Sequence, residues 1–130
     1  MKDPDLIQEW LIKARHDLDT ARVISSQLPD YYDMIAFHCQ QSIEKSIKAY
    51  LIFLDIEFKP VHDLGYLVDL IGTKENSFET YYLKVDEISR YAVQIRYPDS
   101  IVELSKQQIH DAVNLAEELL DLIRSKIESG

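Results

Sequence analysis

The sequence predicts an all-α fold, an antiparallel up-and-down bundle of four long helices plus one short helix. Apolar residues recur at helical spacing in each predicted helix, and no segment shows the alternation that is typical of a strand. Turn-forming residues separate the helical segments. The chain has 130 residues, of which 46% are apolar, so it is long enough to bury one core. We therefore expect a single helical domain over residues 1–130.

The longest helix is predicted from about Tyr31 to Phe58, a stretch without Gly or Pro, and we expect it to be the central helix of the bundle. Its apolar face carries Ala36, Ile43, Ile47, Tyr50, Leu51 and Leu54. Its other side carries a polar stripe at steps of three, four and three residues: His38, Gln41, Lys45 and Lys48. Glu44 lies beside the stripe, one turn before Lys48, at a spacing that favours an ion pair. The stripe is either a solvated face with ordinary charge pairs or a groove for an anionic ligand or a partner.

A second helix is predicted from Leu6 to about Gln27, and Asp17 lies at the margin of its apolar face. A carboxylate at this position must reach solvent or find a hydrogen-bond donor, because burying it unpaired is costly. The pair Pro29–Asp30 follows, which interrupts the chain and is expected to cap the longest helix.

The remaining helices are one short and two long ones. Asp63 is placed to cap a short helix over residues 64–71. His62, just before it, is either a ligand or acid-base group or a histidine that hydrogen-bonds backbone at a loop–helix junction. A further helix is predicted over residues 78–96, and the sequence over residues 105–108 has the form of a capping box that starts a last helix ending near residue 127.

Arg96 interrupts the apolar face of the helix predicted over residues 78–96. Pro98 follows, and because proline disfavours helical geometry in the residue before it, the helix should end there. A cation at a helix C-terminus is favoured by the macrodipole. Since the side chain is predicted to point inward, we expect a ligand or a carboxylate to meet it; the local carboxylates are Asp17, Asp63 and Asp99.

Composition excludes several classes of protein. The net charge is −9 and no basic block is present, which makes a general nucleic-acid binder a poor interpretation. Cys39 is the only cysteine, so no internal disulfide can form. No apolar run is long enough for a signal peptide or a membrane span, and we expect a cytoplasmic protein. No Gly-rich phosphate loop or metal-ligand spacing appears, so neither a cofactor nor a metal is predicted.

Four short segments stand out when they are taken in chain order. They are Ala14-x-x-Asp17-Leu18-x-x-Ala21, the run from Ala36 to Ala49, His62-Asp63-Leu64, and Arg96-Tyr97-Pro98-Asp99. Together they resemble the HEPN domain, a family of small α-helical proteins, and the resemblance covers nearly the whole chain. It implies a helical bundle that pairs into a homodimer, with a cleft between the subunits lined by the second helix and the end of the fourth.

Many HEPN proteins are metal-independent ribonucleases with an arginine followed, after four to six residues, by a histidine. Histidine can move the proton of the ribose 2′-hydroxyl while arginine holds the phosphate. Arg96 matches the arginine, but the positions for the histidine hold Ile101, Val102 and Glu103, and His110 is too far along. Glu103 also takes the place of a tyrosine that a partner nucleotidyltransferase modifies in the family. The resemblance therefore implies the fold, the dimer and a pocket around Arg96.

The first functional hypothesis is a non-catalytic HEPN subunit, a homodimer that binds a nucleotide or another phosphate-bearing ligand. It would accompany a separately encoded minimal nucleotidyltransferase in a toxin–antitoxin-like module. The predicted ligand-binding residues are Arg96, Lys45, Lys48, His38 and Gln41, supported by Asp17, Glu44, His62, Asp63, Tyr97 and Asp99.

Two alternatives stay open. One is an endoribonuclease toxin with a degenerate motif, whose acid-base group would be His38 or His62. The other is a purely structural module, in which Arg96 forms an internal ion pair with Asp17 and the polar stripe is a subunit interface. Only the ribonuclease would act on RNA.

Overall fold

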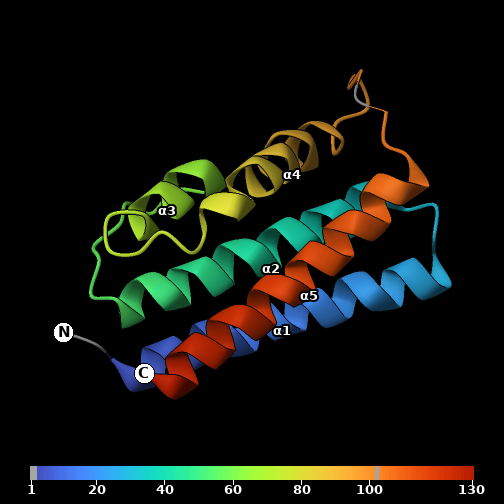
Figure 1. Cartoon of the computed structure of the whole chain (residues 1–130). Coiled ribbons are helices and arrows are strands. Elements are labelled where there is room, and N and C mark those ends of the chain that lie inside the picture. The colour runs from blue at the N-terminus through green and yellow to red at the C-terminus, as the bar shows by residue number, and fades with distance from the viewer. Residues whose placement is uncertain (1–2, 102) are drawn as a thin grey trace.

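The computed structural model describes residues 3–101 and 103–130, and over these ranges the chain is all-helical, as predicted. The elements are α1 (Pro4–Gln27), α2 (Tyr32–Phe53), α3 (Leu64–Ile71), the 3₁₀ turn η1 (Glu79–Tyr81), α4 (Tyr82–Gln94) and α5 (Lys106–Ser129). Consecutive long helices run in opposite directions, so the predicted up-and-down bundle is confirmed (Figure 1). No helix in the described part of the chain combines the length and apolarity needed to cross a bilayer.

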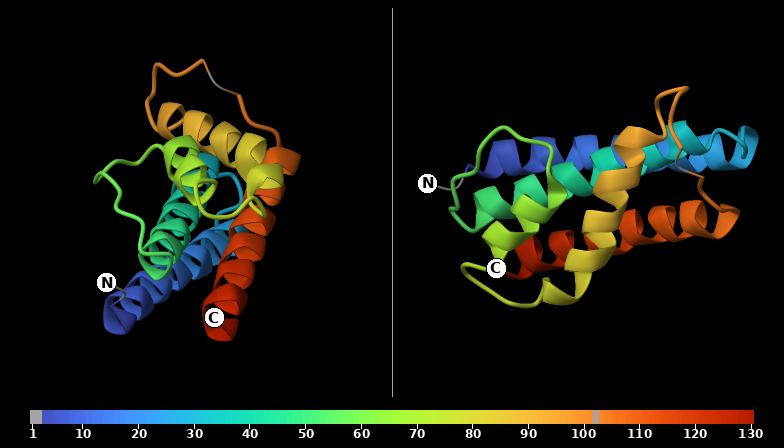
Figure 2. Two further views of the ribbon diagram at one scale, coloured as in Figure 1. Left: turned by 60° about the vertical axis from the view of Figure 1, so that its left-hand side comes forward. Right: turned by 90° about the horizontal axis from the view of Figure 1, so that it is seen from above.

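Helix α2 is the centre of the bundle. It packs against α1, α3, α4 and α5, with α1 and α5 on one side and α3 and α4 on the other (Figures 1 and 2). Its fully buried aliphatic side chains include Ile35, Ile43, Ile47 and Leu51. Because neighbours cover most of it, Glu44 and Lys48 are buried, whereas His38, Gln41 and Lys45 stay partly exposed. The interpretation of the polar stripe as a solvated face is therefore wrong for Lys48.

Helix α2 ends at Phe53, five residues before the predicted end at Phe58. The cause is Asp55, whose φ of 62° lies in the left-handed region. The Asp55 N–H then donates to the carbonyl of Ile52 and the Ile56 N–H to the carbonyl of Leu51, the two bonds of a Schellman motif. Sequence patterns find this motif through glycine, which is absent here.

Two of the three predicted N-caps are confirmed, those of α3 and α5. The Asp63 carboxylate accepts a hydrogen bond from the Tyr66 N–H at 3.2 Å and starts α3, and Ser105 and Gln108 form both bonds of the predicted capping box before α5. The cap predicted for α2 at Pro29–Asp30 is wrong. Its N-cap is Tyr31, whose side chain makes no capping hydrogen bond.

Helix α4 is shorter than the predicted span of residues 78–96. Its N-terminal part forms the 3₁₀ turn η1, and α4 itself ends at Gln94. Arg96 therefore lies in the turn beyond the helix, where its N–H donates to the carbonyl of Val93 at 3.4 Å. A side chain on a turn no longer follows the helical face from which its direction was predicted, and this change decides where the guanidinium points.

Candidate functional site

The candidate site is built on the polar stripe of α2 (His38, Gln41, Lys45 and Lys48) together with Glu44, which lies beside it. The stripe lies beneath α1 and the segment of residues 54–63, which supply Asp17, Trp10, Phe58 and His62. Two separate polar networks result, one around Asp17 and one around Glu44.

Asp17 joins α1 to the first half of the stripe. Its carboxylate accepts a hydrogen bond from Lys45 Nζ at 2.5 Å and lies 2.9 Å from His38 Nδ1. The helices approach closely here because the facing residue of α1 is small: the Ser42 hydroxyl donates to the carbonyl of Ala14 at 2.9 Å. Of the two outcomes predicted for Asp17, exposure to solvent or pairing with a donor, the structure shows pairing with donors. With Nδ1 of His38 on a carboxylate, Nε2 is the ring nitrogen left for another partner.

Glu44 organises the second network. Its carboxylate lies 3.0 Å from Lys48 Nζ and 3.0 Å from His62 Nδ1, and it accepts a hydrogen bond from Gln40 Nε2 at 3.2 Å. Gln41 Nε2 in turn donates to Gln40 Oε1 at 2.9 Å. The ion pair predicted between Glu44 and Lys48 is therefore present, and it is extended by one exposed histidine.

The Glu44–Lys48 pair is buried inside the subunit. The two residues are 3% and 5% exposed. The Lys48 ammonium also lies 5.6 Å from the ring centroid of Trp10 and 5.9 Å from that of Phe58, distances at which an aromatic ring attracts a cation. Because its own chain covers it, this half of the stripe is not a subunit interface. The structural alternative, in which the polar stripe is such an interface, is therefore wrong for Lys48.

Arg96 is exposed, and the prediction that it points inward is wrong. Its guanidinium carbon lies 4.4 Å from the ring centroid of Phe37, a cation–π contact on the outside of α2. Among the described residues no carboxylate lies within ion-pair distance of it, so the proposed pairs with Asp17, Asp63 and Asp99 are absent. The Phe37 ring contacts the His38 ring edge-on at 5.2 Å, which links Arg96 to the Asp17 network.

The other predicted supporting residues lie apart from this contact. Asp63 caps α3, and Tyr97 and Asp99 are exposed in the turn after α4. The His62 side chain is 75% exposed, and its ring meets the Glu44 carboxylate rather than backbone. Its carbonyl accepts a hydrogen bond from Gln40 at 3.4 Å. His62 is thus anchored at the surface end of the Glu44 network.

The arrangement is suited to an anion more than to a cation. Lys45 and Lys48 each have a carboxylate partner, so their charges are largely neutralised. The Arg96 guanidinium is exposed on the Phe37 ring, which in turn contacts the imidazole of His38. No group of three or more histidine, cysteine or carboxylate side chains in the described ranges could hold a metal ion. An exposed guanidinium can bind a phosphate, and a histidine oriented by a carboxylate can exchange a proton with a ligand.

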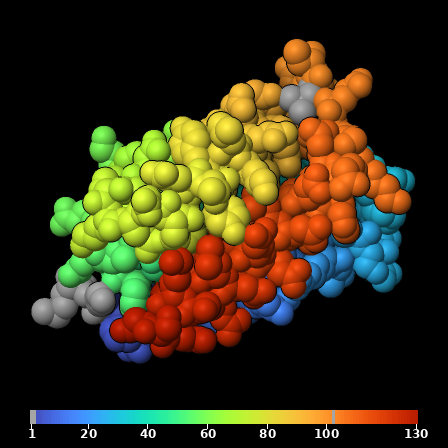
Figure 3. All heavy atoms as spheres, viewed as in Figure 1, coloured from blue at the N-terminus to red at the C-terminus, as the bar shows by residue number. Residues whose placement is uncertain are grey.

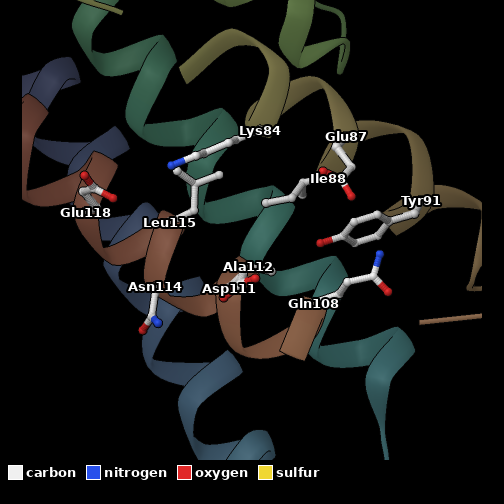
Figure 4. Close-up of a pocket in the computed structure, with 10 residues that line it drawn as sticks. All are labelled: Lys84, Glu87, Ile88, Tyr91, Gln108, Asp111, Ala112, Asn114, Leu115 and Glu118. Atoms are coloured by element: carbon white, nitrogen blue, oxygen red, sulfur yellow. The ribbon is translucent and has the colours of Figure 1, made fainter. Parts of the chain in front are cut away.

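A groove between α4 and α5 was not predicted from the sequence. It has a volume of about 440 Å³, and its lining includes Tyr91, Glu87 and Asp111 (Figure 4). These residues come from two helices whose relative rotation no local pattern encodes. The alternation of acidic and apolar residues on each helix was the available signal, and it is also typical of an ordinary amphipathic surface.

Comparisons with known proteins agree with the family resemblance and with the fold. The model of the HEPN domain matches residues 7–126. A protein of Methanocaldococcus jannaschii named "Putative toxin MJ1304" is 26% identical over 129 aligned positions, which cover 88% of this chain and 84% of that protein.

Two crystal structures are similar over nearly their whole length. ST0689, described as an archaeal HEPN homologue, superposes with a TM-score of 0.72 at 25% identity, covering 93% of this chain and 97% of its own. TT1696 from Thermus thermophilus superposes with a TM-score of 0.73 at 23% identity, covering 92% and 97%. At this lower identity, the similarity to TT1696 shows only that the two chains share a fold.

Proposed function

Because the chain belongs to the HEPN domain family, we propose that it is a non-catalytic subunit that binds a nucleotide or another phosphate-bearing ligand through Arg96. One observation carries the proposal. Among the described residues, Arg96 is exposed and has no carboxylate within ion-pair distance, whereas Lys45 and Lys48 are both paired. A guanidinium offers a planar set of donors that matches two phosphate oxygens, and a charge-assisted hydrogen bond of this kind is strong.

Each predicted residue has a role in this proposal. Arg96 contacts the phosphate from its place on the Phe37 ring, and His38 donates or accepts through Nε2. Gln41 and Lys45, which are partly exposed on the same stripe, border the ligand. Lys48 acts indirectly by neutralising Glu44, which would otherwise repel a phosphate.

Homodimerisation is part of the proposal. Several large apolar side chains are exposed where α2 begins and α4 ends, the region that the Arg96–Phe37 contact joins. They are Tyr31, Met34, Val93, Tyr97 and Ile101. We infer that these side chains form an interaction surface, since exposed apolar patches are typical of such sites. A second copy covering this surface would place two Arg96 side chains at one cleft.

We further propose a minimal nucleotidyltransferase as the partner protein in a toxin–antitoxin-like module. The relative from Methanocaldococcus jannaschii carries the word toxin in its name, which supports such a module here. Purification of the tagged chain together with the neighbouring reading frames tests this step. Recovery of the chain alone, with a nucleotidyltransferase expressed beside it, would argue against the partnership.

The experiment for the ligand is a calorimetric titration with ATP, ADP and inorganic phosphate. Arg96→Ala should weaken the binding of the best of these ligands about tenfold or more, since the lost bond is charge-assisted. Arg90→Ala is the matched control, because Arg90 is an exposed arginine of α4 that pairs with Asp86 at 3.4 Å. It should change the affinity less than about twofold. Absence of binding to all three ligands would remove the proposal.

The second candidate function is a metal-independent endoribonuclease, and one observation favours it. Asp17 holds His38 Nδ1 at 2.9 Å, an arrangement that orients an imidazole for proton transfer through Nε2, and Arg96 lies one aromatic ring away.

A cleavage assay with chelator and single-stranded RNA tests the ribonuclease. The wild type should cleave, His38→Ala should lose activity about a hundredfold or more, and His62→Ala should keep it. RNA that stays intact with a well-folded wild-type protein would leave the phosphate-binding subunit as the better interpretation.

A further inference from the structure

The groove between α4 and α5 is a second candidate binding site, on the face of the molecule that Figure 3 shows. Its volume of about 440 Å³ lies within the range of small-molecule sites. Ile88 from α4 and Ala112 and Leu115 from α5 supply apolar lining. The groove shares no residue with the polar stripe of α2 or with Arg96.

Tyr91 presents a hydroxyl to this groove. The residue is only 9% exposed, and Figure 4 shows its hydroxyl pointing between the two helices. No residue in the described part of the chain hydrogen-bonds this hydroxyl, and its oxygen is not fully buried, so the hydroxyl is accessible to a ligand in the groove. Burial, helped by the charge of Glu87, raises the pKa of Tyr91 far above its ordinary value, so the phenol is neutral and can accept a hydrogen bond.

Carboxylates stand on both walls of the groove. Glu87 on α4 and Asp111 on α5 both lie close enough to act on the Tyr91 phenol. Glu118 follows Asp111 by seven residues on α5, which is two helical turns or about 10 Å. Lys84 is the one cation among the lining residues, so three carboxylates face one ammonium.

The net negative charge of the groove lining indicates which kind of ligand it can bind. An anion would be repelled, and a second copy docked symmetrically on this face would bring the same carboxylates together. A cation with an apolar stem would instead match both the acidic walls and the aliphatic lining. The distance between Asp111 and Glu118 further favours a molecule with positive charge at both ends.

We propose that the groove between α4 and α5 binds an aliphatic polyamine. One ammonium lies between Glu87 and Asp111 and donates to the Tyr91 hydroxyl. The hydrocarbon stem packs on Ile88 and Leu115. The Tyr81 hydroxyl already donates to one carboxylate oxygen of Glu118 at 2.9 Å, so the second ammonium binds the other oxygen. The Lys84 ammonium opposes this second charge.

The test is a calorimetric titration of the full chain with spermidine at near-physiological salt. Saturable binding at one site is expected, and the double variant Glu87→Gln/Asp111→Asn should weaken it about tenfold or more. Tyr91→Phe should weaken it severalfold and Lys84→Met should tighten it, because a competing cation is removed. Butylamine, with a single ammonium, should bind more weakly than spermidine by about tenfold.

A control separates a site from the general attraction of an acidic protein. Glu9→Gln/Asp30→Asn makes the same charge change at two exposed positions outside the groove and should leave the affinity within about twofold. Equal weakening in both double variants, unsaturable heat, or equal affinity for butylamine would each overturn the proposal. Melting curves confirm that the variants are folded. The phosphate-binding proposal predicts nothing for spermidine, so each idea can fail without the other.

Discussion

Two ion pairs of α2 lie one turn apart, and their surroundings differ. Lys48 and Glu44 are buried beneath Trp10 and Phe58, whereas Lys45 and Asp17 are partly exposed. Further towards the start of α2, the Arg96 guanidinium is exposed on Phe37 with no carboxylate partner in the described part of the chain. Positive charge at the surface of α2 is thus paired where it is buried, at Lys48, and unpaired where it is exposed, at the Arg96 guanidinium that lies against Phe37.

This gradient separates stability from function. When one member of a buried ion pair is removed, the other charge stays buried without a counter-charge, which is costly. The buried pair is therefore important for folding. An exposed guanidinium contributes little to folding and keeps its hydrogen-bonding capacity for a ligand. Substitution should therefore change stability strongly at Glu44 on α2 and weakly at Arg96 in the turn after α4, and change ligand binding in the opposite order.

The largest effect is expected from Glu44→Gln. The substitution leaves the Lys48 ammonium buried without a counter-charge, and the free energy of unfolding should fall by about 3–5 kcal/mol. Urea denaturation measures the loss. The double variant Glu44→Gln/Lys48→Met removes both charges and should recover a large part of it. A loss below about 1 kcal/mol in the single variant would mean that the pair is solvated.

A smaller effect is expected from Asp17→Asn. Asp17 forms charge-assisted contacts with Lys45 and His38, but the site is partly exposed, so the loss should be about 2 kcal/mol. A double-mutant cycle with Lys45→Met measures the coupling between the two side chains. Additive effects would show that the contact at 2.5 Å contributes nothing to stability.

Stability at low pH tests the far end of α2, where the Tyr50 hydroxyl donates to Glu75. Burial acts to raise the pKa of Glu75, but hydrogen bonds from Ser77 and Tyr50 and the charge of Lys126 outweigh it and lower the pKa below 4.5. The stabilisation is complete above pH 4.5 and is lost as the pH falls through the lower folded-state pKa. Denaturation curves of Glu75→Gln should therefore show a weaker loss of stability below pH 4.5. An unchanged acid profile would contradict the assignment.

The smallest effect on stability is expected from Arg96→Ala. Only a surface cation–π contact with Phe37 is lost, so the free energy of unfolding should change by about 0.5–1 kcal/mol. Chemical denaturation beside Glu44→Gln makes the comparison direct. A loss of several kcal/mol at Arg96 would restore the structural alternative, in which this arginine holds the fold together.

Much of the fold follows from sequence periodicity. The apolar spacing predicts every helix, and the caps at Asp63 and Ser105 are correct because each is a local interaction between neighbouring residues. The end of α2 could not be predicted, since Asp55 adopts a left-handed conformation that is normally signalled by glycine.

The site was predicted less well, for a physical reason. The need of Asp17 for a donor follows from its place at the edge of an apolar face, and the structure supplies Lys45 and His38. The burial of Lys48 depends on the return of residues 54–63 over α2, which no local pattern encodes. The direction of Arg96 depends on α4 ending at Gln94, because a residue beyond the last turn no longer follows the helical face.

One spectroscopic titration addresses Arg96 most directly. The side-chain Nε–H resonance of Arg96, followed by NMR as ADP or inorganic phosphate is added, should shift and saturate at one ligand per site. The Lys48 ammonium resonance should stay in place because Glu44 and two rings enclose it. A stationary Arg96 resonance, with shifts at Lys48 instead, would contradict the assignment of the exposed guanidinium as the phosphate contact.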